Sequence, residues 1–133
     1  SPADLLLAVL RSDDGAYCGN VGLHELDAVN DNARLGVILR QEMWGQGLAG
    51  EALCGLMDHA FRAMGLHKLY LNVVASNARG IHLYERLGFV REGVLRSEYR
   101  LRGAYQDLVR MSVLSDEWPT PSARERLGLG STT

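Results

Sequence analysis

The sequence predicts a mixed α/β domain, and three observations lead to this prediction. Apolar residues form strand-like runs in the first third of the chain, recur at helical spacing from Leu48, and return to strand-like runs near the C-terminal end. The predicted order is strand–strand–strand–helix–strand–helix–strand–strand, which lacks the regular alternation of a doubly wound sheet. The 133 residues, 47% of them hydrophobic and 23% charged, suit one domain with one core.

The N-terminal part is predicted to be an antiparallel meander of three strands. The Asp-Gly pair in Ser12-Asp13-Asp14-Gly15 tolerates left-handed backbone angles and therefore predicts a hairpin turn. A second turn is predicted over Asp27–Asn32. The first strand is expected to be buried, and two glycines in the second indicate a bulge or close packing. The predicted strands are Leu5–Leu10, Tyr17–Leu26 and Ala33–Leu39.

A helix is predicted from Leu48 to the glycine at position 65. Ser76-Asn77 can cap a second helix that runs to about Leu87 and ends at Gly88. The remaining predicted strands are Lys68–Val74, Phe89–Leu95 and Tyr105–Leu114, the last two joined through Arg102-Gly103. We expect one domain over residues 1–118 and a tail over 119–133 that contains a short helix or frays.

Composition excludes several classes of protein. The formal net charge of −2 argues against a general nucleic-acid binder. No apolar run approaches the roughly 20 residues of a membrane span, and Leu5–Leu10 lacks the flanks of a signal peptide. Cys18 and Cys54 are interpreted as buried reduced thiols, although one bridge between them stays open. No Cys/His cluster has zinc spacing, so we expect no metal site. We also expect a cytoplasmic location.

The most informative stretch is the glycine-rich turn Gly45-Gln46-Gly47-Leu48-Ala49-Gly50, which opens the first predicted helix. The first amides of a helix have no partner within it and lie at its positive end, so such a turn predicts a phosphate seat. The turn matches G-x-G-x-x-G, but the context differs from a dinucleotide site. Arg40–Trp44 separate it from the preceding strand, and no acidic residue ends the next one.

A second motif makes the pattern specific. Asn77 is followed seven residues later by Tyr84 and then by Gly88-Phe89. Together with the glycine turn, these residues resemble the GNAT family of N-acetyltransferases, and in particular its ribosomal-protein and polyamine acetyltransferase branch. Trp44 stands where the family usually has Gln or Arg. The resemblance covers roughly residues 5–118 and implies the acyl-coenzyme A N-acyltransferase fold, with a mostly antiparallel twisted sheet flanked by helices.

The resemblance implies that acetyl-coenzyme A is the co-substrate. The turn would hold its pyrophosphate, the strand edge at Val37, Ile38 and Leu39 would pair with the pantetheine arm, and Asn77 would bond a pantetheine amide. Tyr84 would protonate the leaving thiolate as general acid; the alternative is a core tyrosine with a bonded hydroxyl. The predicted coenzyme-binding residues are Val37, Ile38, Leu39, Trp44, Gly45, Gln46, Gly47, Leu48, Ala49, Gly50, Asn77 and Tyr84.

The general base is less well marked. Many relatives carry a carboxylate on the strand before the turn, where this chain reads Ala33-Arg34-Leu35-Gly36. Glu25 on the preceding predicted strand is the best substitute, acting through a water, although a solvent-facing glutamate is the simpler interpretation. Weaker candidates are Asp27, Asp31 and Asp107, which are more often turn formers or surface charges. His82 is expected on the surface.

The sequence therefore predicts a transferase that moves an acetyl group to a primary amine by direct attack. The acceptor would be a protein N-terminus, a polyamine or another small amine, and nucleic acids and membranes are not expected partners. The alternative is a coenzyme A-binding regulatory or assembly module without catalysis; a dinucleotide oxidoreductase is the least favoured option. The resemblance also implies an N-terminal strand and helices that nothing in the chain supplies, so we expect an incomplete chain. The oligomeric state stays open, with a homodimer as one option.

Overall fold

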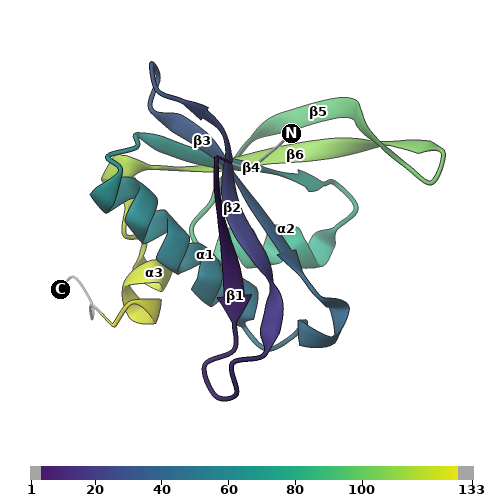
Figure 1. Cartoon of the computed structure of the whole chain (residues 1–133). Coiled ribbons are helices and arrows are strands. Elements are labelled where there is room, and N and C mark those ends of the chain that lie inside the picture. The colour runs from purple at the N-terminus through teal and green to yellow at the C-terminus, as the bar shows by residue number, and fades with distance from the viewer. Residues whose placement is uncertain (1–3, 129–133) are drawn as a thin grey trace.

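The computed structural model describes residues 4–128 and contains one six-stranded sheet with helices packed against it (Figure 1). The strands are β1 (Leu5–Leu10), β2 (Tyr17–Asp27), β3 (Asn32–Leu39), β4 (Lys68–Val74), β5 (Val90–Leu101) and β6 (Ala104–Leu114). The helices are α1 (Leu48–Asp58), α2 (Ala78–Arg86) and α3 (Pro121–Arg126), with short 3₁₀ turns at η1 (Gln41–Met43) and η3 (Ser115–Glu117). This confirms the predicted mixed α/β order and the short helix in the tail.

The sheet has the strand order β1-β2-β3-β4-β6-β5 and is antiparallel except where β3 meets β4. The parallel pairing of these two central strands is short, because it runs only from Asn32↔Lys68 to Arg34↔Tyr70. Beyond these pairs β3 continues to Leu39 and β4 to Val74 without pairing to each other. The two halves of the sheet therefore part in the middle, and one edge of β3 is left without a neighbouring strand (Figure 1).

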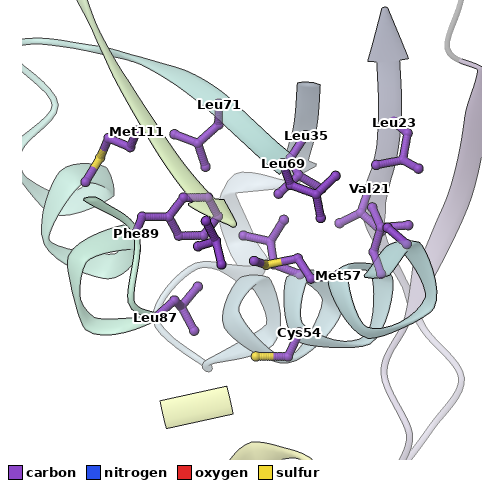
Figure 2. Packing of buried hydrophobic residues seen from close by; sticks show 14 of the residues in the cluster. Val21, Leu23, Leu35, Cys54, Met57, Leu69, Leu71, Leu87, Phe89 and Met111 are labelled. Carbon is purple, nitrogen blue, oxygen red and sulfur yellow. The ribbon is translucent and has the colours of Figure 1, made fainter. Parts of the chain in front are cut away.

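The core lies between the sheet and α1. Figure 2 shows Met57 of α1 on the side of Leu23 and Leu69 of the sheet, Cys54 on the opposite side of the same helix, and Phe89 at the end of the core beside α2. Each of these side chains is nearly or fully buried. Each buried aliphatic side chain contributes about 1.5–3 kcal/mol, so this packing fixes where α1 begins relative to β3. Cys18 and Cys54 are both free and buried, as the reduced-thiol interpretation expected.

The structure corrects the expectation that the first strand is buried. Leu6 and Leu10 of β1 are each 60% exposed, and of this strand only Val9 is buried. The reason is position: β1 pairs with β2 alone and forms one edge of the sheet. An apolar run predicted a strand correctly, but the number of neighbours that cover it depends on the whole sheet.

The C-terminal strands are longer than predicted. β5 extends to Leu101 rather than ending at Leu95, and with β6 it forms a hairpin that projects beyond the rest of the sheet (Figure 1). The pairing is irregular between Leu95 and Tyr99, where Ser97 adopts a left-handed backbone conformation and donates its N–H to the Asp107 carboxylate. This bulge interrupts the alternation of side chains, which is why the sequence pattern ended early.

The first helix also changes form before its end. After Asp58 the chain continues with π-helical geometry over η2 (His59–Ala63), and Gly65 follows with a positive φ, as predicted for the end of the helix. Within residues 4–128, none of the helices has the length and apolar character needed to cross a membrane.

Candidate active site

The start of α1 has the backbone geometry of an anion site. Gly45 and Gly47 both have positive φ, and Gly47 occupies the N-cap position, where no side chain caps the helix. The amide of Glu51 already bonds to the Gly47 carbonyl at 3.2 Å. The three amides before it, from Leu48 to Gly50, have no partner within the helix and lie at the positive end of the helix dipole. An anionic group can accept all three.

These amides border a cavity of about 730 Å³. The cavity joins the end of β3, the glycine turn and the start of α2, three segments that lie apart in the sequence. It is lined by Val37, Ile38, Leu39, Met43, Trp44, Gly45, Gly47, Leu48, Ala49, Gly50, Asn77, Arg79, Gly80, His82, Leu83, Arg86 and Arg126. The structure thus brings together every predicted coenzyme-binding residue except Gln46 and Tyr84. We call this space the donor cavity.

The unpaired edge of β3 runs along the donor cavity. Arg40 donates its backbone N–H to the Cys18 carbonyl at 2.8 Å, which marks a hydrogen-bonded pair of the β2–β3 ladder. Such pairs recur at every second residue, so Ile38 directs its backbone groups to β2, whereas Val37 and Leu39 direct theirs to the open edge. The Leu39 carbonyl accepts the Trp44 indole N–H at 3.2 Å. The backbone groups of Val37 remain for a ligand that lies along the strand.

The donor cavity is also strongly cationic. Arg79 lies over the Trp44 ring, 6.0 Å from its centroid, and Arg86, Arg126 and the imidazole of His82 are also in the lining. The sequence-based prediction missed all three arginines and placed His82 on the surface; the structure shows it exposed and part of the lining. Arg79, His82 and Arg86 follow one another at helical spacing, and this periodicity could have predicted that they lie on one face of α2.

Two predicted residues have other contacts as well. Asn77 caps α2, because its Oδ1 accepts the Gly80 N–H at 2.9 Å, and its Nδ2 remains as a donor at the cavity wall. Gln46 lies outside the lining: its amide oxygen accepts from Arg11 Nη1 at 3.2 Å. The backbone of Gln46 still belongs to the turn that positions the helix start.

A second cavity of about 710 Å³ adjoins the donor cavity and shares Val37 and Ile38 with it. It lies where β3 and β4 part. The lining residues are Leu6, Asn20, Val21, Gly22, His24, Arg34, Leu35, Gly36, Val37, Ile38, Leu53, Leu71, Asn72, Tyr84 and Tyr99. Because it continues the donor cavity through the gap in the sheet, we call it the acceptor cavity.

Tyr84 belongs to the acceptor cavity and not to the donor cavity. Its ring is partly buried and contacts the edge of Phe89 at a centroid distance of 5.8 Å. Burial raises the pKa of the Tyr84 phenol above its usual value. The hydroxyl therefore stays protonated at neutral pH, which is the state a general acid requires.

Glu25 lines neither cavity. Its carboxylate accepts the Tyr70 hydroxyl at 3.3 Å and lies 3.7 Å from Arg34 Nε, so the arginine that replaces the expected acid is paired with the proposed substitute. Glu25 itself has a positive φ at a bulge in β2. Arg34, which lies beside Glu25, does line the acceptor cavity.

The weaker base candidates also lie outside both linings. The Asp27 carboxylate accepts the backbone N–H groups of two residues in its own turn, the Asp31 carbonyl accepts from the backbone N–H of His67, and the Asp107 carboxylate holds the β5 bulge. These contacts agree with the interpretation of Asp27 and Asp31 as turn formers. No carboxylate is among the described residues that line the acceptor cavity.

His24 is a polar residue of the acceptor cavity that the sequence-based prediction did not select. Its ring lies against Gly36, where an added Cβ would be 2.7 Å from Nε2. Its Nδ1 is buried, and within residues 4–128 it has no hydrogen-bond partner. The pairing of β2 with β3 sets His24 opposite Arg34, and β3 and β4 part beyond Arg34. This register places His24 at the acceptor cavity, and the sequence alone does not reveal it.

The chain is similar in sequence to known acetyltransferases. The family model for the acetyltransferase (GNAT) domain matches residues 2–90. A spermidine N(1)-acetyltransferase from Vibrio cholerae is 37% identical over 100 residues, which are 75% of this chain and 58% of that protein. A putative ribosomal N-acetyltransferase from Bacillus subtilis is 34% identical over 79% of this chain and 57% of its own length.

Solved structures give the same result for the fold. A crystal structure of a spermidine/spermine N-acetyltransferase from Vibrio cholerae superposes with a TM-score of 0.81 at 34% identity, covering 85% of this chain and 66% of that one. The chain therefore spans less than two thirds of the length of these relatives.

Proposed function

The chain belongs to the GNAT acetyltransferase family, and on this basis we propose that it transfers an acetyl group from acetyl-coenzyme A to a primary amine. The observation that carries the proposal is the junction of two cavities at the open edge of β3: one has uncapped helix amides and arginines, and the other contains a partly buried tyrosine. A long polyanionic donor suits the first cavity, and its acyl end would then lie at the gap that leads into the second.

The residues of the donor cavity suit the parts of coenzyme A. The amides of Leu48–Gly50 would donate hydrogen bonds to the pyrophosphate, and the backbone of Val37 would pair with the pantetheine arm as an added strand does. The Nδ2 of Asn77 would donate to a pantetheine carbonyl. An outward-facing β3 amide beside the gap would polarise the thioester carbonyl, a contribution of about 3 kcal/mol.

The acceptor cavity suits the proton transfers. The donor supplies an acetyl group activated as a thioester; the amine nitrogen bonds to the carbonyl carbon as the carbon–sulfur bond breaks. Tyr84 would give its proton to the departing sulfur, because burial keeps the phenol protonated. The proton lost by the amine would pass to a base, for which Glu25 acting through a water is our proposal. Tyr84 then recovers a proton from solvent.

The acceptor is proposed at the level of a class, a primary amine such as a polyamine or a protein N-terminus. Two of the relatives are named for spermidine and for ribosomal proteins, which supports both choices. Glu25, Asp27, Asp31 and Asp107, acidic residues that could favour a cationic acceptor, lie outside the acceptor cavity. The test must therefore include both kinds of amine.

The test is release of free thiol from acetyl-coenzyme A with a panel of spermidine, a peptide with a free α-amine and a small monoamine, run beside a thermal-shift measurement with the donor alone. We expect stabilisation by the donor and thiol release with at least one amine. Stabilisation without thiol release under every condition would contradict catalysis and favour the coenzyme A-binding module. Stabilisation by NAD but not by coenzyme A would overturn both.

A further inference from the structure

Arg126, from the C-terminal helix α3, lies against the start of α1. A Cβ added at Gly50 would be 2.8 Å from Arg126 Nη1, 3.0 Å from Cζ and 3.2 Å from Nη2, so the whole guanidinium faces this glycine. Gly50 is the third residue of α1 and is buried, and both residues line the donor cavity. Arg126 is exposed to solvent, and the absence of a side chain at position 50 lets its guanidinium lie close to the α1 backbone.

The charge at this place is unfavourable in the protein alone. The first turn of a helix carries a partial positive charge, so a cation beside it is repelled. The described part of the chain gives Arg126 neither a hydrogen bond nor an ion pair with a carboxylate. Glu51 also lies in the first turn of α1. The amides of α1 and the Arg126 guanidinium border one space, and both can donate to the same anion.

The place of α3 beside α1 is set by buried residues of this helix. Thr120 caps α3 through its Oγ1, which accepts the Ala123 N–H at 3.2 Å, and the same hydroxyl donates to the Leu87 carbonyl at 2.7 Å. Ala123 is fully buried. One turn of helix separates this buried residue from Arg126, so packing holds α3 beside α1 (Figure 1).

We propose, on the basis of the function proposed above, that Arg126 binds the diphosphate of the donor and that the C-terminal segment is thereby part of the donor site. Arg126 faces the helix start from α3, whereas Arg79 and Arg86 line the cavity from α2. The diphosphate lies between the α1 amides and this guanidinium. The residue stands outside the part of the chain that the family model matches, residues 2–90.

The experiment compares Arg126→Gln with Arg126→Lys and with Arg96→Gln, which removes the same charge from an exposed site on β5 outside both cavities. Each full-length variant is titrated with acetyl-coenzyme A, with its form lacking the 3′-phosphate, and with acetyl-pantetheine, which has no phosphate. For Arg126→Gln we expect about tenfold weaker binding of both phosphorylated donors. Binding of acetyl-pantetheine should not change, Arg126→Lys should recover part of the loss, and Arg96→Gln should behave as the parent.

The outcomes separate this inference from the proposed function. Equal affinity of Arg126→Gln and the parent for acetyl-coenzyme A would overturn the role of Arg126 and leave the proposed function intact. A loss that disappears with the donor lacking the 3′-phosphate would place Arg126 on that phosphate and would also overturn the diphosphate assignment. A parent protein that binds none of the donors would contradict the proposed function itself.

Discussion

The donor and acceptor cavities meet at Val37 and Ile38, yet they are built differently. The donor cavity uses backbone amides at the start of α1 and three arginines from α2 and α3. In the acceptor cavity the polar lining consists mainly of single side chains from separate strands, such as His24, Asn72 and Tyr99, together with Tyr84 of α2. Neither lining contains a carboxylate among the described residues, but the donor lining has three arginines and the acceptor lining has one, Arg34.

This difference follows from the ligands. A diphosphate needs many donors at fixed positions, and a helix start supplies several of them from consecutive residues. An amine acceptor needs one acid, one base and a shaped wall, which come from side chains on different elements. Variants of the donor cavity should therefore change affinity for the donor, whereas variants of the acceptor cavity should change turnover.

The largest expected effect is that of Tyr84→Phe. Removal of the phenol should lower kcat by roughly 10²–10⁴, because the departing sulfur loses its acid, while the affinity for acetyl-coenzyme A stays nearly unchanged. Burial raises the Tyr84 pKa above its ordinary 10.0, so the parent should show no loss of activity from this group up to that pH. Steady-state kinetics over pH and a binding titration measure both.

Tyr105→Phe is the matched control, because Tyr105 is 64% exposed on the β5–β6 hairpin. Its kcat should equal that of the parent. Unchanged turnover in Tyr84→Phe would remove the general-acid role and leave Tyr84 as a packing residue of α2.

A smaller effect is expected for Glu25→Gln, and it tests where the base lies. Because Glu25 lies outside the acceptor cavity and is proposed to act through a water, we expect kcat/KM to fall by about 10²-fold, at the lower end for general-base catalysis, with a changed pH–rate profile. The comparison variant is His24→Gln, which alters a residue of the lining itself. A pH–rate profile that is unchanged in Glu25→Gln but altered in His24→Gln would mean that the base is His24, inside the acceptor cavity, and not Glu25.

The smallest expected effect comes from two glycines of the α1 region. Neither Gly47 nor Gly55 has an atom within 4 Å of an added Cβ, so substitution by Ala tests the backbone alone. Gly47 has a φ of +75°, where Ala costs about 1 kcal/mol, whereas Gly55 lies inside the helix, where Ala gains about 0.5–1 kcal/mol. Thermal unfolding should shift in opposite directions, by roughly 3 °C each.

The donor then distinguishes the two variants further. Stabilisation by acetyl-coenzyme A should decrease for Gly47→Ala, whose backbone orients the amides of α1, and should equal that of the parent for Gly55→Ala. Equal stabilisation of both variants would mean that the turn does not hold the donor.

Much of the fold was predictable because its signals are local. The boundaries of β1, β4 and the start of α1 agree with the sequence pattern, and Asn77 caps α2 as expected. The exposure of β1 was not predictable, because it depends on which strands and helices come to lie beside it. The extension of β5 was missed for a related reason: the bulge at Ser97 is stabilised by Asp107, a residue on another strand.

The sequence by itself determined the elements and the uncapped start of α1, since the glycines, the amides and the preceding strand lie within one continuous stretch. The tertiary structure alone decided three things: the parting of β3 and β4, the placement of His24 and not Glu25 in the acceptor cavity, and the approach of Arg126 to Gly50. Backbone conformation depends mainly on neighbouring residues, so a short stretch of sequence can predict it. Contacts between distant segments follow from how a buried core packs, and no short pattern in the sequence records that geometry.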